Sequence, residues 1–305
     1  MSTRRAKRIG LIEPPRELNK TIKHKITIVS KNNKNSKKIF IITIFECKTS
    51  ITIYIGSPNI YCIDCQLLKN INTGIPYTGI LTKARWDIEC SIDNYFKKGN
   101  DSPAQEQFKN QLYELDDSIL IIKLLLSYIK NNYPTVHDII FTDMSTKECD
   151  DKSSVNLASM KVFTDGKTWY ETHFDVKMGD IYKELYDKMK IQANKIKSEL
   201  QFDNFMGYAI IDKLAIEKEE LKKMYDEART WQDFFSQIRE KIGVSKYCIW
   251  LGTSNWFDNF VRTILQFNTL GLQFIFEPKE YITYSINEYT GGRHTTIKKY
   301  SKQTN

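Results

Sequence analysis

Runs of apolar and β-branched residues in the first part of the chain predict β-strands. Polar and apolar residues alternate at 25–29, the period of a strand with one buried face. A polar stretch at 30–36 and Gly-Ser-Pro-Asn at 56–59 predict turns between the runs. The expected strands are residues 25–29, 39–45, 51–55, 60–68 and 80–90. Because short turns join the first strands, the pattern predicts an antiparallel meander.

A continuous apolar segment at 119–131 predicts a buried helix. Its residues are apolar nearly all round, which is typical of a helix without a solvent-facing side. Asp117 and Ser118 are the expected cap, and Tyr133-Pro134 ends the helix. The run at 136–142 then predicts a strand. A helix, a short turn and a strand form the unit that lays a helix across a sheet.

The second half of the chain has a mostly helical pattern, after a polar stretch at 143–154 that predicts a loop. The predicted helices cover residues 181–200, 217–228, 231–242 and 254–267. We therefore expect an α/β (α+β) protein. It has an N-terminal antiparallel or mixed sheet with a buried central helix, followed by a mostly helical C-terminal half.

Four parts are expected along the chain. A basic flexible arm at 1–20 precedes an α/β region at 21–150, on which a helical region at 151–270 packs. An extended basic tail at 271–305 follows. A chain of 305 residues is long enough to bury a core, as one large domain or two smaller ones.

Basic residues gather at the N-terminus. Residues 1–38 hold twelve Lys or Arg against Glu13 and Glu17, so this segment alone carries +10, whereas the whole chain carries +8. Such an arm suits a polyanion, with Arg4, Arg5, Lys7 and Arg8 as contacts, and nucleic-acid binding would be non-specific because no sequence-reading motif is present. The alternative is a solvated terminus that keeps the protein soluble.

The six cysteines do not indicate a disulfide framework by themselves. No apolar stretch follows the basic start, so no secretory signal is expected. A large chain without such a signal is expected to keep its thiols reduced. The apolar runs fall short of the ~20 residues that cross a bilayer. We therefore expect a soluble, cytosolic protein without a transmembrane segment.

No metal site is expected. Cys62 and Cys65 form a C-x-x-C pair, but zinc needs four ligands, and the chain has neither a second pair nor clustered histidines. The pair falls in a predicted strand, where two such thiols point to different faces. The chain also has no glycine-rich phosphate loop.

The most distinctive motif combines a turn, a cap and aromatic residues. Asp165-Gly166 predicts a turn. Thr168 fits the cap of a short helix with Glu171 at its third position, which is the spacing of a capping box. Thr230 is a similar cap before a second aromatic stretch. The aromatic residues of the two stretches are Trp169, Tyr170, Trp231, Phe234 and Phe235.

Two interpretations of these aromatic residues remain open. Their side chains either line a pocket together with Glu171 and His173, or pack and anchor a helix to the sheet. If the protein is an enzyme, the candidate catalytic groups are Asp143, Glu171 and His173, since a carboxylate or an imidazole can accept a proton from a substrate amine.

Gly-Lys-Thr-Trp-Tyr-Glu at 166–171, with Thr-Trp-Gln-Asp-Phe-Phe at 230–235, resembles a protein family of nucleocytoplasmic large DNA viruses, the giant-virus lineage. The resemblance covers residues 80–260, and a composition rich in Lys, Asn and Ile agrees with an AT-rich genome. Those viral proteins are distantly similar to GCN5-type N-acetyltransferases. The resemblance therefore implies that residues 21–150 form an acetyltransferase-like region.

In acetyltransferases of that type, acetyl-CoA binds through backbone N–H groups at the N-terminus of the central helix, here 119–131. The approach to this helix, residues 113–118, has no glycine and carries three carboxylates, Glu114, Asp116 and Asp117. Carboxylates at a helix start occupy the place of a phosphate. No cofactor is therefore expected, and acetyl-CoA enters only under an alternative function.

The sequence and the resemblance together suggest three alternative functions. The first is a non-catalytic viral interaction or virion-associated protein on an acetyltransferase-like scaffold, with other viral proteins as partners, in the host cytoplasm, virus factory or particle. The second is an acetyl-CoA-dependent N-acyltransferase. The third is a non-specific nucleic-acid-associated protein that uses the basic arm.

Overall fold

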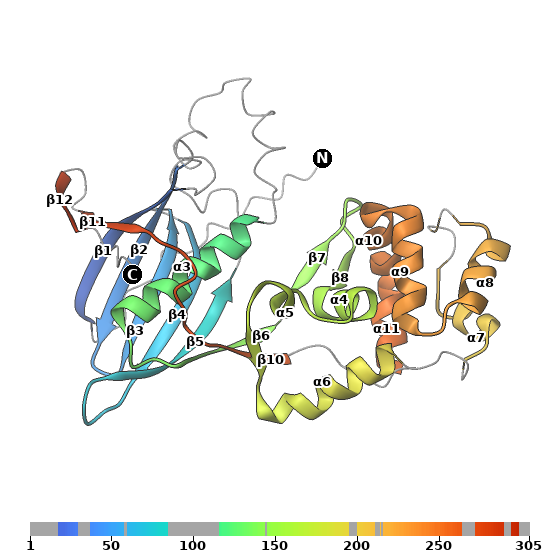
Figure 1. The fold of residues 1–305 in the computed structure, drawn as a ribbon, viewed down its shortest axis with the longest axis horizontal. Helices are drawn as coiled ribbons and strands as arrows, with labels where there is room; N and C mark the ends of the chain where they lie inside the picture. The colour runs from blue at the N-terminus through green and yellow to red at the C-terminus, as the bar shows by residue number, and fades with distance from the viewer. Residues whose placement is uncertain are drawn as a thin grey trace, which may run out of the picture. The chain divides into compact units, whose positions relative to one another are not determined.

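The computed structural model describes residues 18–29, 37–57, 60–84, 116–143, 145–194, 200–210, 214, 216–263, 272–289 and 294–298. The chain forms two compact units, shown in Figure 1. Unit 1 comprises residues 1–139 and 278–305, and unit 2 comprises residues 140–277. The fold class is α+β, as the sequence pattern predicted, with most strands in the N-terminal half and most helices in the C-terminal half.

Unit 1 is built on an antiparallel sheet. Strands β1 (Leu18–Val29), β2 (Lys37–Cys47), β3 (Ser50–Ser57), β4 (Ile60–Lys69) and β5 (Pro76–Ala84) pair in sequence order. The predicted meander is thus confirmed. The last predicted strand begins earlier than the apolar run indicated, and residues 85–90 lie outside the described residues.

Two strands from the C-terminal end extend this sheet beyond β1. Strand β11 (Ser285–Tyr289) pairs antiparallel with β1, with Ile286 opposite Ile26. Strand β12 (His294–Lys298) then pairs with β11. Part of the segment that the sequence predicted as an extended tail is therefore hydrogen-bonded sheet.

Helix α3 (Asp116–Asn132) lies across the sheet of unit 1 (Figure 1). Leu124, Leu125, Leu126 and Ile129 are fully buried, as expected for a helix that is apolar nearly all round. The helix begins before Asp117 and Ser118, so the predicted cap lies inside its first turn. Polar residues at the start of a helix do not show in an apolar pattern, which accounts for the difference.

A buried serine of α3 ties the C-terminal segment to the helix. The Ser127 hydroxyl oxygen accepts hydrogen bonds from the backbone N–H groups of Tyr281 (2.9 Å) and Ile282 (3.1 Å). These bonds satisfy two backbone donors that lie outside any strand. The described residues 278–289 are therefore held at two places within unit 1, α3 and β1.

Unit 2 is mostly helical around a small set of strands. Strands β6 (Asp138–Asp143), β10 (Leu272–Phe276) and β9 (Val176–Met178) are neighbours in that order. The helices are α4 (Leu157–Asp165), α5 (Trp169–His173), α6 (Asp180–Ala193), α7 (Phe202–Met206), α8 (Lys218–Glu227), α9 (Trp231–Ile242), α10 (Val244–Gly252) and α11 (Trp256–Thr263), with a 3₁₀ turn at Thr253–Asn255.

The predicted loop at 143–154 contains a short hairpin. Strand β7 (Thr146–Glu148) pairs antiparallel with β8 (Ser154–Asn156). Each strand has three residues, which is too short to give a recognisable alternation in the sequence. The prediction of a loop is therefore wrong for these residues.

A disulfide joins this hairpin to α10. Cys149 and Cys248 are bonded, with a Cα–Cα distance of 5.6 Å, although they are 99 residues apart in sequence. Cys62 is also disulfide-bonded, whereas Cys47 and Cys65 are free and buried. The expectation that all thiols are reduced is therefore wrong. Burial raises the pKa of the Cys65 thiol, with a smaller effect from the Asp64 carboxylate.

Within the described residues, no helix combines the length and apolar character required to cross a membrane.

Candidate functional site in the segment from α4 to α6

Helix α4 ends at the glycine of the sequence motif. Asn156 caps its N-terminus by accepting a hydrogen bond from the Ser159 N–H (2.9 Å). At the other end, Gly166 has a φ of 75° and donates its N–H to the Val162 carbonyl (3.0 Å). A Cβ at this position would lie 2.8 Å from Nε2 of Gln232. The left-handed conformation therefore favours glycine, whereas the flexible end of the Gln232 side chain could move away from an added Cβ.

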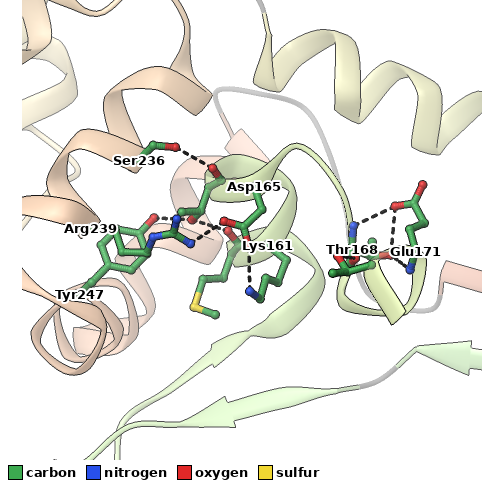
Figure 2. Close-up of polar contacts among 10 residues, drawn as sticks. Lys161, Asp165, Thr168, Glu171, Ser236, Arg239 and Tyr247 are labelled. Carbon is green, nitrogen blue, oxygen red and sulfur yellow. Dashed lines mark hydrogen bonds and ion pairs between the residues drawn. The ribbon is translucent and has the colours of Figure 1, made fainter. Parts of the chain in front are cut away.

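Asp165, the last residue of α4, is held by two cations (Figure 2). Lys161 Nζ lies 2.7 Å from Oδ2, and Arg239 of α9 pairs with Oδ1. Burial disfavours the charged form of this carboxyl, but the hydrogen bonds from Lys161 and Arg239 outweigh burial and lower its pKa. Asp165 therefore stays ionised and fastens α4 to α9.

The neighbouring residue Thr164 adds two further links to the same helices. Ser236 of α9 donates its hydroxyl to the Thr164 carbonyl (2.6 Å). The hydroxyls of Thr164 and Tyr247 of α10 lie 2.8 Å apart. Burial raises the pKa of Tyr247, so the hydroxyl stays protonated. The end of α4 is thus fixed to α9 and α10 by hydrogen bonds with Ser236, Arg239 and Tyr247.

The short helix α5 starts with the predicted capping box. Thr168 Oγ1 accepts the Glu171 N–H (3.3 Å), and the Thr168 N–H donates to Oε2 of Glu171 (2.8 Å). The prediction of this cap is confirmed, as is the second cap, in which Thr230 accepts the Asp233 N–H (3.0 Å) at the start of α9. Both arrangements satisfy backbone donors that a helix start leaves unpaired.

The Glu171 carboxylate also accepts hydrogen bonds from two side chains of α6. Lys190 Nζ lies 2.8 Å from Oε1, and the Tyr186 hydroxyl donates to Oε2. The Lys190 ammonium sits 4.6 Å from the centre of the Tyr186 ring, a cation–π contact. Burial disfavours the charged carboxylate, but the donors Lys190, Tyr186 and the Thr168 N–H outweigh it and lower the Glu171 pKa. Burial and the Glu171 carboxylate raise the pKa of Tyr186.

Asp143, the second candidate catalytic residue, is buried at the end of β6. Its Oδ1 accepts the Ser145 N–H (2.9 Å) and the Ser145 hydroxyl. Burial raises the pKa of Asp143, and the two Ser145 hydrogen bonds oppose this shift. The Tyr170 hydroxyl also has a raised pKa, from burial and then from the Asp143 charge. Asp143 and Tyr170 are therefore electrostatic neighbours.

His173, the third candidate, ends α5 and packs against Trp169 with ring centres 4.9 Å apart. It is two residues from Glu171 on the same helix, and residues two apart do not share a helix face. The three candidates thus have different neighbours: Ser145 and Tyr170 for Asp143, α6 for Glu171 and Trp169 for His173.

The predicted aromatic residues separate into two packed groups. Tyr170 contacts the β6 and β10 residues Phe141, Phe274 and Phe276, with the Phe141 ring centre 4.5 Å away, and Trp169 packs on its edge. Trp231, Phe234 and Phe235 are buried in α9 among other rings: Phe163, Phe205, Tyr225, Trp250, Phe257 and Phe260. Both groups contribute to the core of unit 2.

Four polar residues that hold the site's carboxylates were not singled out from the sequence: Lys161, Tyr186 and Lys190 of this segment, and Arg239 of α9. Tyr186 and Lys190 are four residues apart, so the helical period places them on one face. No sequence signal identifies their partner, because Glu171 lies on another helix. The predicted polyanion contacts Arg4, Arg5, Lys7 and Arg8 lie outside the described residues. Among the residues that are described, no group of His, Cys, Asp and Glu could hold a metal ion.

No protein-family model matches this chain, and neither a curated protein nor a solved structure matches it. The resemblance to the giant-virus family and to acetyltransferases therefore stays a prediction.

Proposed function

We propose that this chain is a non-catalytic interaction protein. The observation that carries the proposal is the set of hydrogen bonds to Glu171. Its carboxylate accepts them from the Thr168 N–H, the Tyr186 hydroxyl and the Lys190 ammonium. A carboxylate with a lowered pKa and several donors is a weak general base. It is also well suited to joining two helices, since charge-assisted hydrogen bonds are stronger than neutral ones.

The other ionisable groups of the segment support the same proposal. Asp165 pairs with Lys161 and Arg239, and both of its oxygens are engaged. Asp143 is buried and hydrogen-bonded to Ser145. The contacts of these carboxylates give Asp165 and Asp143 a structural role that needs no catalytic reaction.

We propose further that the partners are viral proteins and that the chain is a virion component, present in the virus factory of the host cytoplasm before packaging. The resemblance carried by Gly-Lys-Thr-Trp-Tyr-Glu at 166–171 supports this part. Mass spectrometry of purified particles is expected to detect the chain. Its absence from particles, with abundant protein in infected cells, would remove the virion part and leave the interaction part.

The competing function, an acetyl-CoA-dependent N-acyltransferase, makes an opposite prediction. A ligand at a hundred times its dissociation constant stabilises the folded state by ~2.7 kcal/mol. We expect no change in the melting temperature of the full chain with millimolar acetyl-CoA, and no release of CoA thiol with a lysine peptide or a polyamine. A thermal shift together with thiol release that Glu171→Gln abolishes would overturn the proposal.

A further inference from the structure

The hairpin between β4 and β5 presents an exposed apolar tip. Every large apolar side chain that is exposed in the described part of unit 1 belongs to this hairpin. These side chains are Ile71 (77% exposed), Ile75 (49%), Tyr77 (53%) and Ile80 (36%). The other residues of the tip, Asn72, Thr73 and Gly74, are exposed as well. The concentration of exposed apolar side chains in one hairpin favours an interaction surface over an ordinary loop.

The tip of the hairpin and most of β5 are also uncharged. No Asp, Glu, Lys, Arg or His occurs from Asn70 to Thr82, although 27% of the residues of the chain are charged. Loops that face only water normally carry polar or charged side chains, whereas transfer of a charge out of water is costly. The composition of the tip thus favours contact with a medium less polar than water.

Five backbone N–H groups of the tip are paired within it. The Asn70 N–H donates to the Ile75 carbonyl (2.9 Å), and the Gly74 N–H to the Asn70 carbonyl (2.7 Å). Asn70 Oδ1 accepts the N–H groups of Asn72 (2.9 Å) and Thr73 (3.3 Å), and Thr73 Oγ1 accepts that of Ile75 (3.3 Å). In lipid, an unpaired backbone donor has no water to bind. These bonds therefore lower the cost of moving the tip out of water, because five of its donors stay paired.

Lysines flank the tip at the same end of the sheet. The β2–β3 turn, with exposed Lys48, lies beside the base of the hairpin, since the Lys69 N–H donates to the Thr49 carbonyl (2.9 Å). Lys130 is exposed in the last turn of α3, and the chain that follows α3 reaches the hairpin through Thr135, whose hydroxyl donates to the Pro76 carbonyl (2.6 Å).

The carboxylates of this end are few. Glu46 is paired with Lys69 at 2.7 Å. Asp138 is exposed and lies beside β5, since its backbone carbonyl accepts a hydrogen bond from the Thr78 hydroxyl (3.2 Å). An uncharged apolar tip with flanking cations matches the interface of an anionic bilayer, where apolar groups enter the headgroup boundary and lysines contact lipid phosphates.

We propose that the β4–β5 hairpin docks unit 1 on an anionic lipid surface. Ile71 and Ile75 enter the boundary between headgroups and acyl chains, Tyr77 lies at headgroup level, and Lys48 and Lys130 contact the headgroups. Aromatic residues with a polar end favour this level of a bilayer. The proposal is independent of whether unit 2 has a catalytic activity.

Flotation of the full chain with phosphatidylcholine–phosphatidylserine vesicles tests the proposal. Ile71→Asp should reduce the vesicle-bound to free ratio roughly tenfold or more. The matched control is Ile191→Asp, which changes an isoleucine that is 63% exposed in unit 2 and should bind like the unchanged protein. The basic residues at 1–38 are present in both variants, so any lipid binding that they contribute is the same. Since Ile71 is exposed, circular dichroism should show both variants folded.

Two further arms separate the possible outcomes. Replacement of Lys48 and Lys130 by Gln should weaken binding to these vesicles, and pure phosphatidylcholine vesicles should bind the unchanged protein less. A polarity-sensitive fluorophore on Thr73→Cys should shift to the blue when vesicles are added. Equal binding of the two aspartate variants, or vesicle-bound protein with unshifted emission, would overturn the proposal and point to a protein as the occupant of the tip.

Discussion

The Nζ atom of Lys190 lies 2.8 Å from Oε1 of Glu171, and this ion pair joins α6 to the first turn of α5. The same carboxylate completes the capping box of α5 through the Thr168 N–H. One side chain thus stabilises the start of a helix of five residues and links it to a neighbouring helix. A helix this short does not persist on its own propensity, so we expect its stability to depend on these contacts.

Replacement of Glu171 by Gln should lower the free energy of unfolding by about 1–2 kcal/mol at neutral pH, since it removes a partly buried charge from its hydrogen-bonded partners. Urea denaturation followed by circular dichroism measures the change. The matched control is Glu184→Gln on α6, which removes an exposed pair with Lys188 and should have no measurable effect. Equal losses in the two variants would contradict the structural role of Glu171.

The stabilising effect of Glu171 should disappear in acid. Its folded-state pKa is lowered, so its contribution is fully present above the unfolded-state pKa of ~4.3 and is lost as the pH falls through the folded-state value. The difference in unfolding free energy between the unchanged protein and Glu171→Gln should be constant from pH 7 to pH 5 and shrink below about pH 4. Asp143, whose raised pKa acts in the opposite direction, is common to both proteins and cancels. A difference that grows as the pH falls would contradict the assigned ionisation.

Gly166→Ala should destabilise the protein less than Gly243→Ala. Gly166 has a φ of 75° and a ψ of 0°, the left-handed helical region, where alanine costs ~1 kcal/mol. Gly243 has a φ of 81° and a ψ of 162°, a region that is essentially restricted to glycine. The Cβ added at Gly166 would lie 2.8 Å from Nε2 of Gln232, which is the end of a flexible side chain and can move, whereas nothing lies within 4 Å of the position at Gly243. Urea denaturation measures both losses, and a larger loss at Gly166 would contradict the backbone origin of the difference.

The disulfide between Cys149 and Cys248 should be detectable in the native protein. Proteolysis without reductant, after alkylation of free thiols, is expected to give a cross-linked peptide pair in mass spectrometry. Replacement of both residues by Ser should lower the free energy of unfolding by about 2–5 kcal/mol, because the bond closes a long loop. Cys47→Ser, which changes a buried free thiol, serves as the control and should cost less. Alkylation of both Cys149 and Cys248 in the untreated protein would contradict the bond.

The sequence predicted the parts of the fold that depend on local pattern. The strands of the meander, the buried helix and the caps at Thr168 and Thr230 are all set by residues close together in the chain. The hairpin β7–β8 was missed because three residues cannot display a period, and the start of α3 was misplaced because its first residues are polar.

The partners of the motif at 165–171 could not be predicted from the sequence. Glu171 and Lys190 are 19 residues apart, and Asp165 and Arg239 are 74 apart, so no local pattern relates them. The same holds for Cys149 and Cys248, whose pairing depends on the packing of α10 against the hairpin rather than on the number of cysteines or the missing secretory signal. The residue types of the motif are visible in the sequence, whereas the contacts that their side chains make depend on the tertiary fold.

A double-mutant cycle between Glu171 and Lys190 tests the central claim, that this carboxylate is a structural group joining α5 to α6. We predict that Glu171→Gln, Lys190→Met and the double variant give a coupling free energy of about 1 kcal/mol in urea denaturation. The same cycle on the exposed pair Glu184 and Lys188 should give a coupling indistinguishable from zero. A coupling between Glu171 and Lys190 no larger than that of the exposed pair would contradict the account.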